Sequence, residues 1–339
     1  MIYVLCPGAF KTGGTELLHQ LVYQINKLAN NQDATIVYYG DNTKNPEIKE
    51  FDKYIDGRWI RENEVNEDKN NIFIFPETGL SEFNKFKLGK KYIWWLSVDN
   101  FNVSGSYIGF SGFKNIFNQR GFYHTIGGIL KGKIKRQKKA IEQADMHLFQ
   151  SYYAADFLKH LGILESKKAY LSDYINDIYF DDIGQFNDKV RKNVVLYNPK
   201  KGYNFTKKLI SQSNNEINWV PLINMTNDEV KNTLLSSKVY IDFGNHPGKD
   251  RFPREAAISG CCIITDKRGS AGNNKDIPIL SKYKFADTNE NVSSILNQIK
   301  FCLNNYEESM KDFQEYRNRI KREKSEFEVD CKHIFKYKN

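Results

Sequence analysis

The sequence predicts an α/β protein made of two Rossmann-like domains, each built on a parallel sheet. Short apolar runs of strand length alternate with amphipathic stretches of helix length, first in the N-terminal half and again after residue 193. Alternation of this kind produces parallel strands with helices on both faces of the sheet. The length of 339 residues agrees with two domains of ~150 residues each.

In the first half, apolar runs closed by turn or polar residues predict strands, and apolar residues at helical spacing predict helices. We expect strands over 2–6, 34–39, 72–75, 92–98 and 146–150, and helices over 16–28, 133–144 and 153–161. The stretch 105–128 is rich in Gly, Phe and Tyr without a clear period, so we expect irregular structure near a cleft. These elements form a first domain over 1–176.

The second half repeats the alternation. We expect strands over 194–197, 217–221, 239–243 and 262–265, and helices over 205–212, 228–236 and 253–259. They form a second domain over 190–315, and the polar stretch 177–192 is the expected linker. Residues 292–324 have a charged, helical pattern, and the segment 316–339 could pack back on the first domain.

Composition excludes several classes of protein. Hydrophobic residues make up 40% and aromatic residues 14% of the chain, which is too much apolar bulk for a disordered protein. No apolar run approaches the ~18 residues of a membrane-spanning helix, and the N-terminus has the pattern of a strand rather than a signal peptide. The 5 Cys have no C-x-x-C spacing, which argues against a zinc site or a disulfide framework. We expect a soluble, cytoplasmic protein.

The net charge is +9, from 50 Lys and Arg against 41 Asp and Glu. This excess suggests an anionic partner, such as nucleic acid, a phospholipid surface or a phosphorylated small molecule. A solvated basic surface explains the charge equally well, so charge by itself leaves the function open.

The first candidate site is the loop between the first strand and the first helix, residues 7–20 (PGAFKTGGTELLHQ). Unpaired N–H groups at a helix start favour an anion or a hydroxyl-rich ligand, and Gly13 and Gly14 let the backbone approach it closely. Thr12 or Thr15 can cap the helix. The loop matches neither the G-x-G-x-x-G fingerprint nor the P-loop, and a tight turn without a ligand is the alternative.

A richer candidate is the stretch 239–278, in which a strand is followed by the loop 244–251. Open α/β sheets bind ligands at the carboxyl ends of their strands, and this loop contains His246, Lys249 and Arg251. Pro253 suits the first turn of the next helix, so Glu255 projects from a helix whose N-terminus faces the expected cleft. A solvated basic edge, with Glu255 paired to Arg251, is the alternative.

Two further loops at the same sheet edge are basic and contain glycine. One follows the strand over 262–265 and contains Gly269 and Ser270, and the other follows 194–197 and contains Lys200 and Lys201. With the loop 244–251 they could form a cradle for a diphosphate. A surface pair of lysines is the alternative for Lys200 and Lys201.

These residues resemble the motifs of GT-B glycosyltransferases, most closely the large retaining class that uses nucleotide sugars to build bacterial surface glycans. The matching pieces are Gly13-Gly14 for the Gly-Gly turn, 143–151 (QADMHLFQS) for the strand that closes the first domain, Lys201-Gly202 for the donor-phosphate Lys-Gly, 254–265 (REAAISGCCIIT) for the EA-x-A-x-G-x-P-V-I-x-T helix and strand, and 267–270 for the diphosphate loop.

The resemblance implies two domains facing across a cleft, and transfer of a sugar from a nucleotide-diphosphate sugar to a glycan or lipid-linked acceptor in capsule or lipopolysaccharide synthesis. It implies that Glu255 accepts hydrogen bonds from the ribose hydroxyls. The implied donor-binding residues are Gly13, Gly14, Lys200, His246, Lys249, Arg254, Glu255, Gly269 and Ser270.

The sequence departs from the class at two positions. The acidic residue of the class, eight positions before Glu255, is here Pro247, and the Arg that precedes the phosphate Lys is absent near Tyr197 and Asn198. Lys249 and Arg251 are candidates for the missing positive charge.

Sugar transfer places growing negative charge on the β-phosphate of the leaving nucleotide, and cations aimed at that phosphate stabilise the transition state. We expect Lys201 and Arg251 to supply this charge as the catalytic groups. No metal or other cofactor is therefore expected, and the chain has no Asp-x-Asp motif to hold a metal.

The acceptor would lie against the first domain. Its expected neighbours are Gly13, Gly14, Thr15, Asp99 and His124. If transfer inverted the anomeric centre, Asp99, at the expected end of a buried strand, or His124 would deprotonate the acceptor hydroxyl. A turn cap is the alternative for Asp99, and a structural ring is the alternative for His124. His19 lies in mid-helix and could face the core or the cleft.

Residues 131–139 (KGKIKRQKK) contain 6 basic and no acidic residues, beside a partial apolar stripe at helical spacing. A basic amphipathic helix could rest on anionic lipid, which would place the protein on the inner face of the cell membrane. A solvated helix face is the alternative.

Two other classes of function stay open. A nucleotide-sugar epimerase or hydrolase of the same shape would consume donor without an acceptor. A nucleic-acid-binding protein would explain the charge and the aromatic residues, but the basic residues stand at strand-edge loops and no RNA or DNA motif is present.

Overall fold

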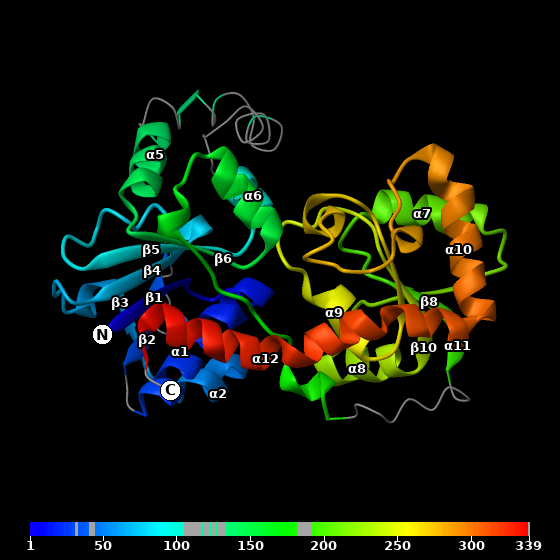
Figure 1. Ribbon diagram of the computed structural model, residues 1–339, viewed down its shortest axis with the longest axis horizontal. Helices are drawn as coiled ribbons and strands as arrows, with labels where there is room; N and C mark the ends of the chain where they lie inside the picture. Colours follow the sequence, from blue (N-terminus) through cyan, green and yellow to red (C-terminus); the bar gives the residue numbers. More distant parts are fainter. Residues whose placement is uncertain are drawn as a thin grey trace. The chain divides into compact units, whose positions relative to one another are not determined.

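The computed structural model describes residues 1–30, 33–40, 45–104, 117, 123, 126–127, 133–181 and 191–337. The chain divides into two compact units (Figure 1). Unit 1 contains Met1–Asp173 and Glu326–Asn339, and unit 2 contains Tyr174–Ser325. The expected domain limits at 176 and 190 lie on the unit 2 side of this division. No helix in the described part of the chain is both long and apolar enough to cross a membrane.

Unit 1 is built on a seven-stranded parallel sheet of order β3-β2-β1-β4-β5-β6-β7. Its strands are β1 (Ile2–Pro7), β2 (Ala34–Tyr39), β3 (Trp59–Arg61), β4 (Ile72–Pro76), β5 (Lys90–Trp95), β6 (Met146–Phe149) and β7 (Lys168–Tyr170). The strand order reverses between β1 and β4, so the carboxyl ends of these two strands form the topological switch point of this sheet.

The strands β1, β2 and β4 of unit 1 are buried along almost their whole length, as expected where helices cover both sides of a parallel sheet. The helices are α1 (Gly13–Ala29), α2 (Asp52–Ile55), α3 (Val98–Ser104), α5 (Lys133–Gln143) and α6 (Tyr152–His160). Phe73, Phe75 and Trp95 lie fully buried in the core, and the Trp95 ring meets Phe101 of α3 edge-on.

Unit 2 contains a four-stranded parallel sheet of order β11-β10-β8-β9. Its strands are β8 (Lys192–Tyr197), β9 (Asn218–Pro221), β10 (Ser237–Asp242) and β11 (Cys262–Thr265). Its helices are α7 (Tyr203–Gln212), α8 (Asn227–Leu235), α9 (Arg251–Ile258), α10 (Val292–Asn304), α11 (Tyr306–Ser309) and the first half of α12 (Gln314–Phe335). The order reverses between β8 and β10, which gives unit 2 its own switch point.

The C-terminal helical stretch is broken rather than continuous, because Asn305 ends α10 in a non-helical conformation. Residues of α12 belong to both units. In unit 1, Phe327 stacks on Trp94, and the Asp330 carboxylate accepts the Ser172 N–H at 3.1 Å. The second half of α12 is thus part of the core of unit 1.

Two element boundaries differ from expectation in ways that bear on function. Helix α1 begins at Gly13, three residues before the expected start, because Thr12 caps it: its hydroxyl accepts the Thr15 N–H at 3.1 Å. Strand β5 ends at Trp95. The expectation that Asp99 ends a buried strand is therefore wrong, and Asp99 lies in the first turn of α3.

Candidate functional site

The switch point of unit 2 brings together the loops that follow β8 and β10. Gly202, with φ 58°, precedes α7, and a Cβ there would lie 1.9 Å from the Phe243 carbonyl oxygen. Gly244, with φ 127°, approaches Gly202 equally closely, since a Cβ on Gly244 would lie 2.7 Å from the Gly202 nitrogen. The two backbones touch at a distance that only glycine permits. Because Lys201 directly precedes Gly202, this contact places Lys201 beside the β10 loop.

Lys201 is the centre of a charged cluster, which we define as Lys201, Asp242, His246, Asp250 and Asp266. Its Nζ lies 3.0 Å from Asp242 Oδ1 and 3.0 Å from His246 Nδ1, and it also contacts the Asp250 carboxylate. Burial acts to lower the pKa of Lys201, but the two carboxylates outweigh it and raise the pKa above its ordinary value. The lysine is therefore a permanent cation with 18% of its side chain exposed.

His246 is fully buried and links the cluster to the β11 loop. Its Nε2 lies 3.2 Å from the Asp242 carbonyl oxygen and 3.3 Å from Asp266 Oδ1. Both neighbours are acceptors, so this nitrogen carries a proton. Its Nδ1 lies 2.9 Å from Asp250 Oδ2. Burial acts to lower the pKa of His246, but Asp242 and Asp250 reverse this and raise it.

Asp242, His246 and Asp250 also place three ligand-type atoms within 4.8 Å of one another, a spacing that could hold a metal ion. The Lys201 ammonium contacts both carboxylates of this group. Burial acts to raise the pKa of Asp250, but Lys201 and His246 outweigh it and lower the pKa. Lys201 thus provides a positive charge beside the buried Asp242 and the half-buried Asp250.

Lys249 and Arg254 lie beside the cluster and engage a partner that the sequence did not indicate. Glu323 of α12 binds Lys249 Nζ at 2.9 Å through one carboxylate oxygen and Arg254 Nη1 at 2.8 Å through the other. All three side chains are at most 3% exposed. Arg254 also donates to the carbonyls of Lys249, at 2.9 Å, and Asp250, at 3.2 Å. This set, the Glu323 clamp, fixes the backbone of the β10 loop.

The remaining predicted donor residues surround the same loops. Glu255 is buried on α9, and Arg251 is half-buried where α9 begins. Lys200 is exposed beside Lys201. Ser270 is buried, and it donates through its hydroxyl to the Gly248 carbonyl and through its N–H to the His246 carbonyl at 3.0 Å. The β11 loop is thereby tied to the β10 loop, with Gly269 at the point of contact.

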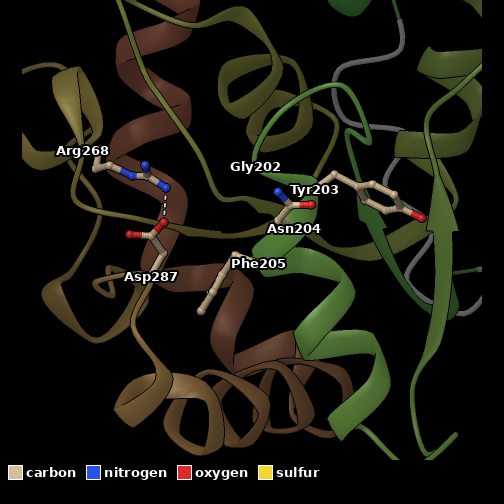
Figure 2. A pocket seen from close by; sticks show the side chains of 6 residues that line it. All are labelled: Gly202, Tyr203, Asn204, Phe205, Arg268 and Asp287. Atoms are coloured by element: carbon tan, nitrogen blue, oxygen red, sulfur yellow. Dashed lines mark hydrogen bonds and ion pairs between the residues drawn. The ribbon is translucent and has the colours of Figure 1, made fainter. Parts of the chain in front are cut away.

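A pocket of 360 Å³ opens at the start of α7. Figure 2 shows its lining, in which Asn204 and Phe205 come from the first turn of α7, while Arg268 and Asp287 form an ion pair on the other side. Arg268 also donates its backbone N–H to Asp266 at 3.0 Å. The Asp266 carboxylate thus joins the pocket wall to the charged cluster.

In unit 1, the residues predicted near the acceptor occupy two turns. Thr15 is buried, and its hydroxyl donates to the Phe10 carbonyl at 2.9 Å and lies within the α1 cap. Asp99 is half-buried and accepts the Tyr153 hydroxyl proton at 2.8 Å. His124 and the start of the basic run, residues 131–132, lie outside the described residues.

His19 belongs to the core rather than to a ligand site. Its Nδ1 lies 2.7 Å from the Thr15 carbonyl oxygen and its Nε2 lies 2.7 Å from the Tyr38 hydroxyl. Burial lowers the pKa of His19 to about 4, so the ring is neutral at physiological pH.

Three carboxylates near the candidate sites were not predicted from the sequence: Glu77, Asp242 and Glu323. For Glu77 and Asp242 a signal existed, because Glu77 directly follows a buried strand and Asp242 ends one. Both stand where open sheets bind ligands. Glu323 has no local signal, because its partner Arg254 is 69 residues away in the chain.

Several solved structures share the fold of this chain. The chain is similar to a glycosyltransferase from Rickettsia africae, at TM-score 0.61 and 16% identity over 99% of both chains. It is also similar to Anabaena HepE in complex with UDP-glucose, at TM-score 0.62 and 10% identity over 99% of both chains. Sucrose-phosphate synthase from Thermosynechococcus elongatus matches at TM-score 0.65 and 10% identity, over 99% of this chain and 98% of the other.

A scan against protein-family models finds no match, and a search of curated proteins finds none either. At these identities the likeness establishes the fold: two α/β domains with parallel sheets, the GT-B fold. Fold by itself does not establish activity.

Proposed function

We propose that the protein is a glycosyltransferase that moves a sugar from a nucleotide-diphosphate sugar to an acceptor hydroxyl. The observation that carries the proposal is the half-buried cation Lys201 at the switch point of unit 2, in a fold shared with glycosyltransferases. Ligands of open α/β sheets bind at this point. HepE, which shares the fold, is described in complex with UDP-glucose, and this supports a nucleotide sugar as donor.

On the donor side, Lys201 is the residue that meets the diphosphate. Its ammonium is held by Asp242 and Asp250, and a phosphate oxygen can take the place of one carboxylate as its partner. When the glycosidic bond breaks, the bonding electrons pass to the β-phosphate oxygen, and a fixed cation there stabilises the transition state. Arg251, at the start of α9, supplies a second positive charge, and Glu255 accepts hydrogen bonds from the ribose hydroxyls.

The Glu323 clamp changes the roles proposed for Lys249 and Arg254. Both side chains are bound to the buried Glu323 carboxylate, so their contribution to donor binding is to hold the β10 loop in place. His246 likewise acts within the cluster, where it orders Asp250 beside Lys201. We propose a reaction that needs no metal ion, because Lys201 and Arg251 supply the positive charge.

The acceptor binds unit 1 in this proposal, at the α1 turn of Gly13 and Gly14 and at the β5–α3 turn that carries Asp99. We propose a glycan or lipid-linked acceptor of bacterial surface polysaccharide synthesis, and transfer with retention of the anomeric configuration. These finer assignments rest on the resemblance of Gly13-Gly14 and of 254–265 to the retaining class.

The direct test is a transfer assay. The protein is incubated with UDP, GDP, ADP and CMP sugars, with and without a panel of glycan and lipid-linked acceptors, and nucleotide release and product mass are followed. Release that requires an acceptor and yields a glycosylated product supports the proposal. Release without an acceptor would assign the chain to hydrolases or epimerases, and oligonucleotide binding without any donor turnover would contradict the proposal.

Membrane association is a separate part of the proposal. Helix α5 exposes Lys135, Arg136, Lys138 and Lys139, which suits the anionic inner face of the cell membrane. Reversing three of these charges, Lys135→Glu, Arg136→Glu and Lys139→Glu, should abolish sedimentation with phosphatidylglycerol vesicles.

The matched control for this test removes the same net charge from exposed lysines of unit 2, as Lys192→Glu, Lys207→Glu and Lys311→Glu. If both triple variants lose sedimentation equally, net charge rather than α5 is responsible, and the assignment of α5 to the membrane fails.

A further inference from the structure

The switch point of unit 1 holds a buried carboxyl group that the proposed mechanism does not use. Glu77 directly follows β4, in the short 3-10 helix η3 (Glu77–Gly79), and is 3% exposed. Helix η3 contacts β1, β4, β5 and α3. Glu77 therefore lies at the carboxyl ends of β1 and β4, the switch point at which open α/β sheets bind ligands.

The Glu77 carboxylate ties the end of β4 to the turn between β5 and α3. Its Oε2 accepts the Leu96 N–H at 2.9 Å, and the Ser97 N–H also bonds to the carboxylate. Helix α3 begins at the next residue, and Asp99 lies in its first turn. On the other side, a Cβ on Gly14 would lie 3.7 Å from the Leu96 side chain. One carboxylate thus holds the turn that lies between the α1 start and Asp99.

The charge of this carboxyl changes near neutral pH. Burial raises the pKa of Glu77 to about 7, against the lowering by the N–H groups of Leu96, Glu77 and Ser97. The elements packed around it carry, at this end, the buried Cys6 thiol of β1 and Asp99 of α3, and Tyr39 of β2 lies close enough to sense its charge. All of these groups are neutral or negative, so none opposes the effect of burial.

Ionisation changes what the group can hold. An ionised carboxylate is acceptor-only and can bind both turn N–H groups, whereas the protonated acid gives up part of that capacity to an O–H donor. Charge-assisted hydrogen bonds are also roughly twice as strong as neutral ones. The turn is therefore held more firmly above pH 7 than below it.

We propose that Glu77 is the positioning residue of the acceptor side: its carboxylate fixes the Leu96–Ser97 turn and so sets the place of Asp99 against the acceptor. The proposal rests on the proposed glycosyltransferase function. Glu77 itself touches no substrate. Its effect is expected on acceptor binding and not on donor binding, because the donor cluster belongs to unit 2.

The first test separates the two substrates and uses Glu77→Gln. In wild type, KM for the acceptor should rise several-fold as pH falls from 8 to 6, with KM for the donor unchanged. In Glu77→Gln, which keeps one amide oxygen as acceptor but has no charge, KM for the acceptor should be high and independent of pH. A variant whose acceptor KM follows the wild-type pH profile would overturn the proposal.

The control is Glu82→Gln. Glu82 lies in the same segment, is also buried, and pairs with Ser81 and Lys85 rather than with the turn. Its variant should keep the wild-type acceptor KM and pH profile. An equal effect of both variants would show that the segment as a whole, and not the Glu77 carboxylate, is responsible.

A stability measurement distinguishes positioning from a merely structural role. The native pKa is raised above the ordinary 4.5, so the native state binds this proton more tightly than the unfolded state does. As pH falls from about 7 to about 5, the Tm of wild type should rise relative to Glu77→Gln. Stability and acceptor affinity would then move in opposite directions, and loss of both together in acid would contradict the proposal.

Amide hydrogen exchange tests the proposal on the wild-type protein. It requires neither transfer activity nor a Glu77→Gln variant that folds. In wild type, the Leu96 and Ser97 amides should be more protected above pH 7 than below it, after correction with amides of β4. If transfer activity is absent but this change is seen, the proposed function fails and the role of Glu77 in the turn stands. If the protection does not change, the positioning role fails by itself.

Discussion

The switch points of the two units have the same topology and opposite chemistry. In both sheets the strand order reverses beside a central strand, at β1/β4 in unit 1 and at β8/β10 in unit 2. The switch point of unit 1 holds Glu77, which is bonded to backbone N–H groups. That of unit 2 holds the charged cluster around Lys201.

We infer from this difference that the strand order of a sheet determines where a ligand binds, whereas the side chains of the loops determine which ligand binds there. A diphosphate carries charge and needs a fixed cation, and in the proposed function Lys201 of unit 2 is that cation. An acceptor hydroxyl is neutral and needs a hydrogen-bond acceptor. In the proposed reaction Asp99 of unit 1 has this role, and Glu77 only positions it. The Lys201 ammonium contacts Asp242 and Asp250, so under the proposed function a donor phosphate competes with these two carboxylates.

The largest expected effect comes from the Glu323 clamp. Glu323→Gln removes the buried carboxylate that binds both Lys249 and Arg254. Breaking a buried ion pair from one side costs about 3–5 kcal/mol, which should appear as a lower free energy of unfolding in urea. The control Glu315→Gln, exposed on the same helix, should change it by less than about 0.5 kcal/mol.

Removal of the Lys201 ammonium comes next. Lys201→Met should lower kcat for transfer by about 10²–10³-fold, the cost of losing one preorganised group that stabilises the developing charge. Lys192→Met, an exposed lysine at the amino end of β8, should retain wild-type kcat. If Lys201→Met and wild type had equal kcat for transfer, the β-phosphate of the donor would not lie beside Lys201.

Backbone contact between the two loops of unit 2 is tested by Gly202→Ala. Its Cβ would meet the Phe243 carbonyl oxygen at 1.9 Å, so the variant should lose more than the roughly 1–2 kcal/mol that a left-handed residue costs by itself. Gly162→Ala has a similar φ, 73°, with open space around the Cβ, and should show only the conformational cost. Equal melting temperatures of the two variants would disprove the close approach.

The smallest effect is expected on the acceptor side. Tyr153→Phe removes the hydroxyl that donates to Asp99 at 2.8 Å, a loss of roughly 1 kcal/mol. KM for the acceptor should rise by a few-fold and KM for the donor should not change. Tyr23→Phe, an exposed tyrosine on α1, is the control. A change in KM for the donor would show that Asp99 acts in donor binding rather than in acceptor binding, which would contradict the proposal.

The fold was largely predictable because long apolar runs between turn residues leave few choices. The expected ranges 34–39 and 262–265 coincide with β2 and β11. The three-residue strands β3 and β7 carry no apolar run of their own and were missed. They lie at the two ends of the sheet, where pairing with one neighbour rather than local pattern defines a strand.

The candidate site was predictable only in part. Lys201 and His246 were identified from their place after strands, and the structure brings them within 3.0 Å of each other. The carboxylates that raise the pKa of Lys201 and of His246 are not evident from the sequence. Asp242 lies within a predicted strand, and Asp250 lies in a loop with several basic residues. Pairings such as Arg254 with Glu323 depend on tertiary contact across 69 residues, which no local pattern encodes.

The most direct test of the central claim is thermal stability of the protein with UDP, GDP, ADP and CMP, with and without EDTA. A ligand at about 100 times its Kd stabilises the native state by about 2.7 kcal/mol. We predict that one nucleotide diphosphate raises Tm equally with and without EDTA, that Lys201→Met abolishes the rise, and that Lys192→Met retains it. No rise with any nucleotide, together with a rise on adding an oligonucleotide, would contradict the account.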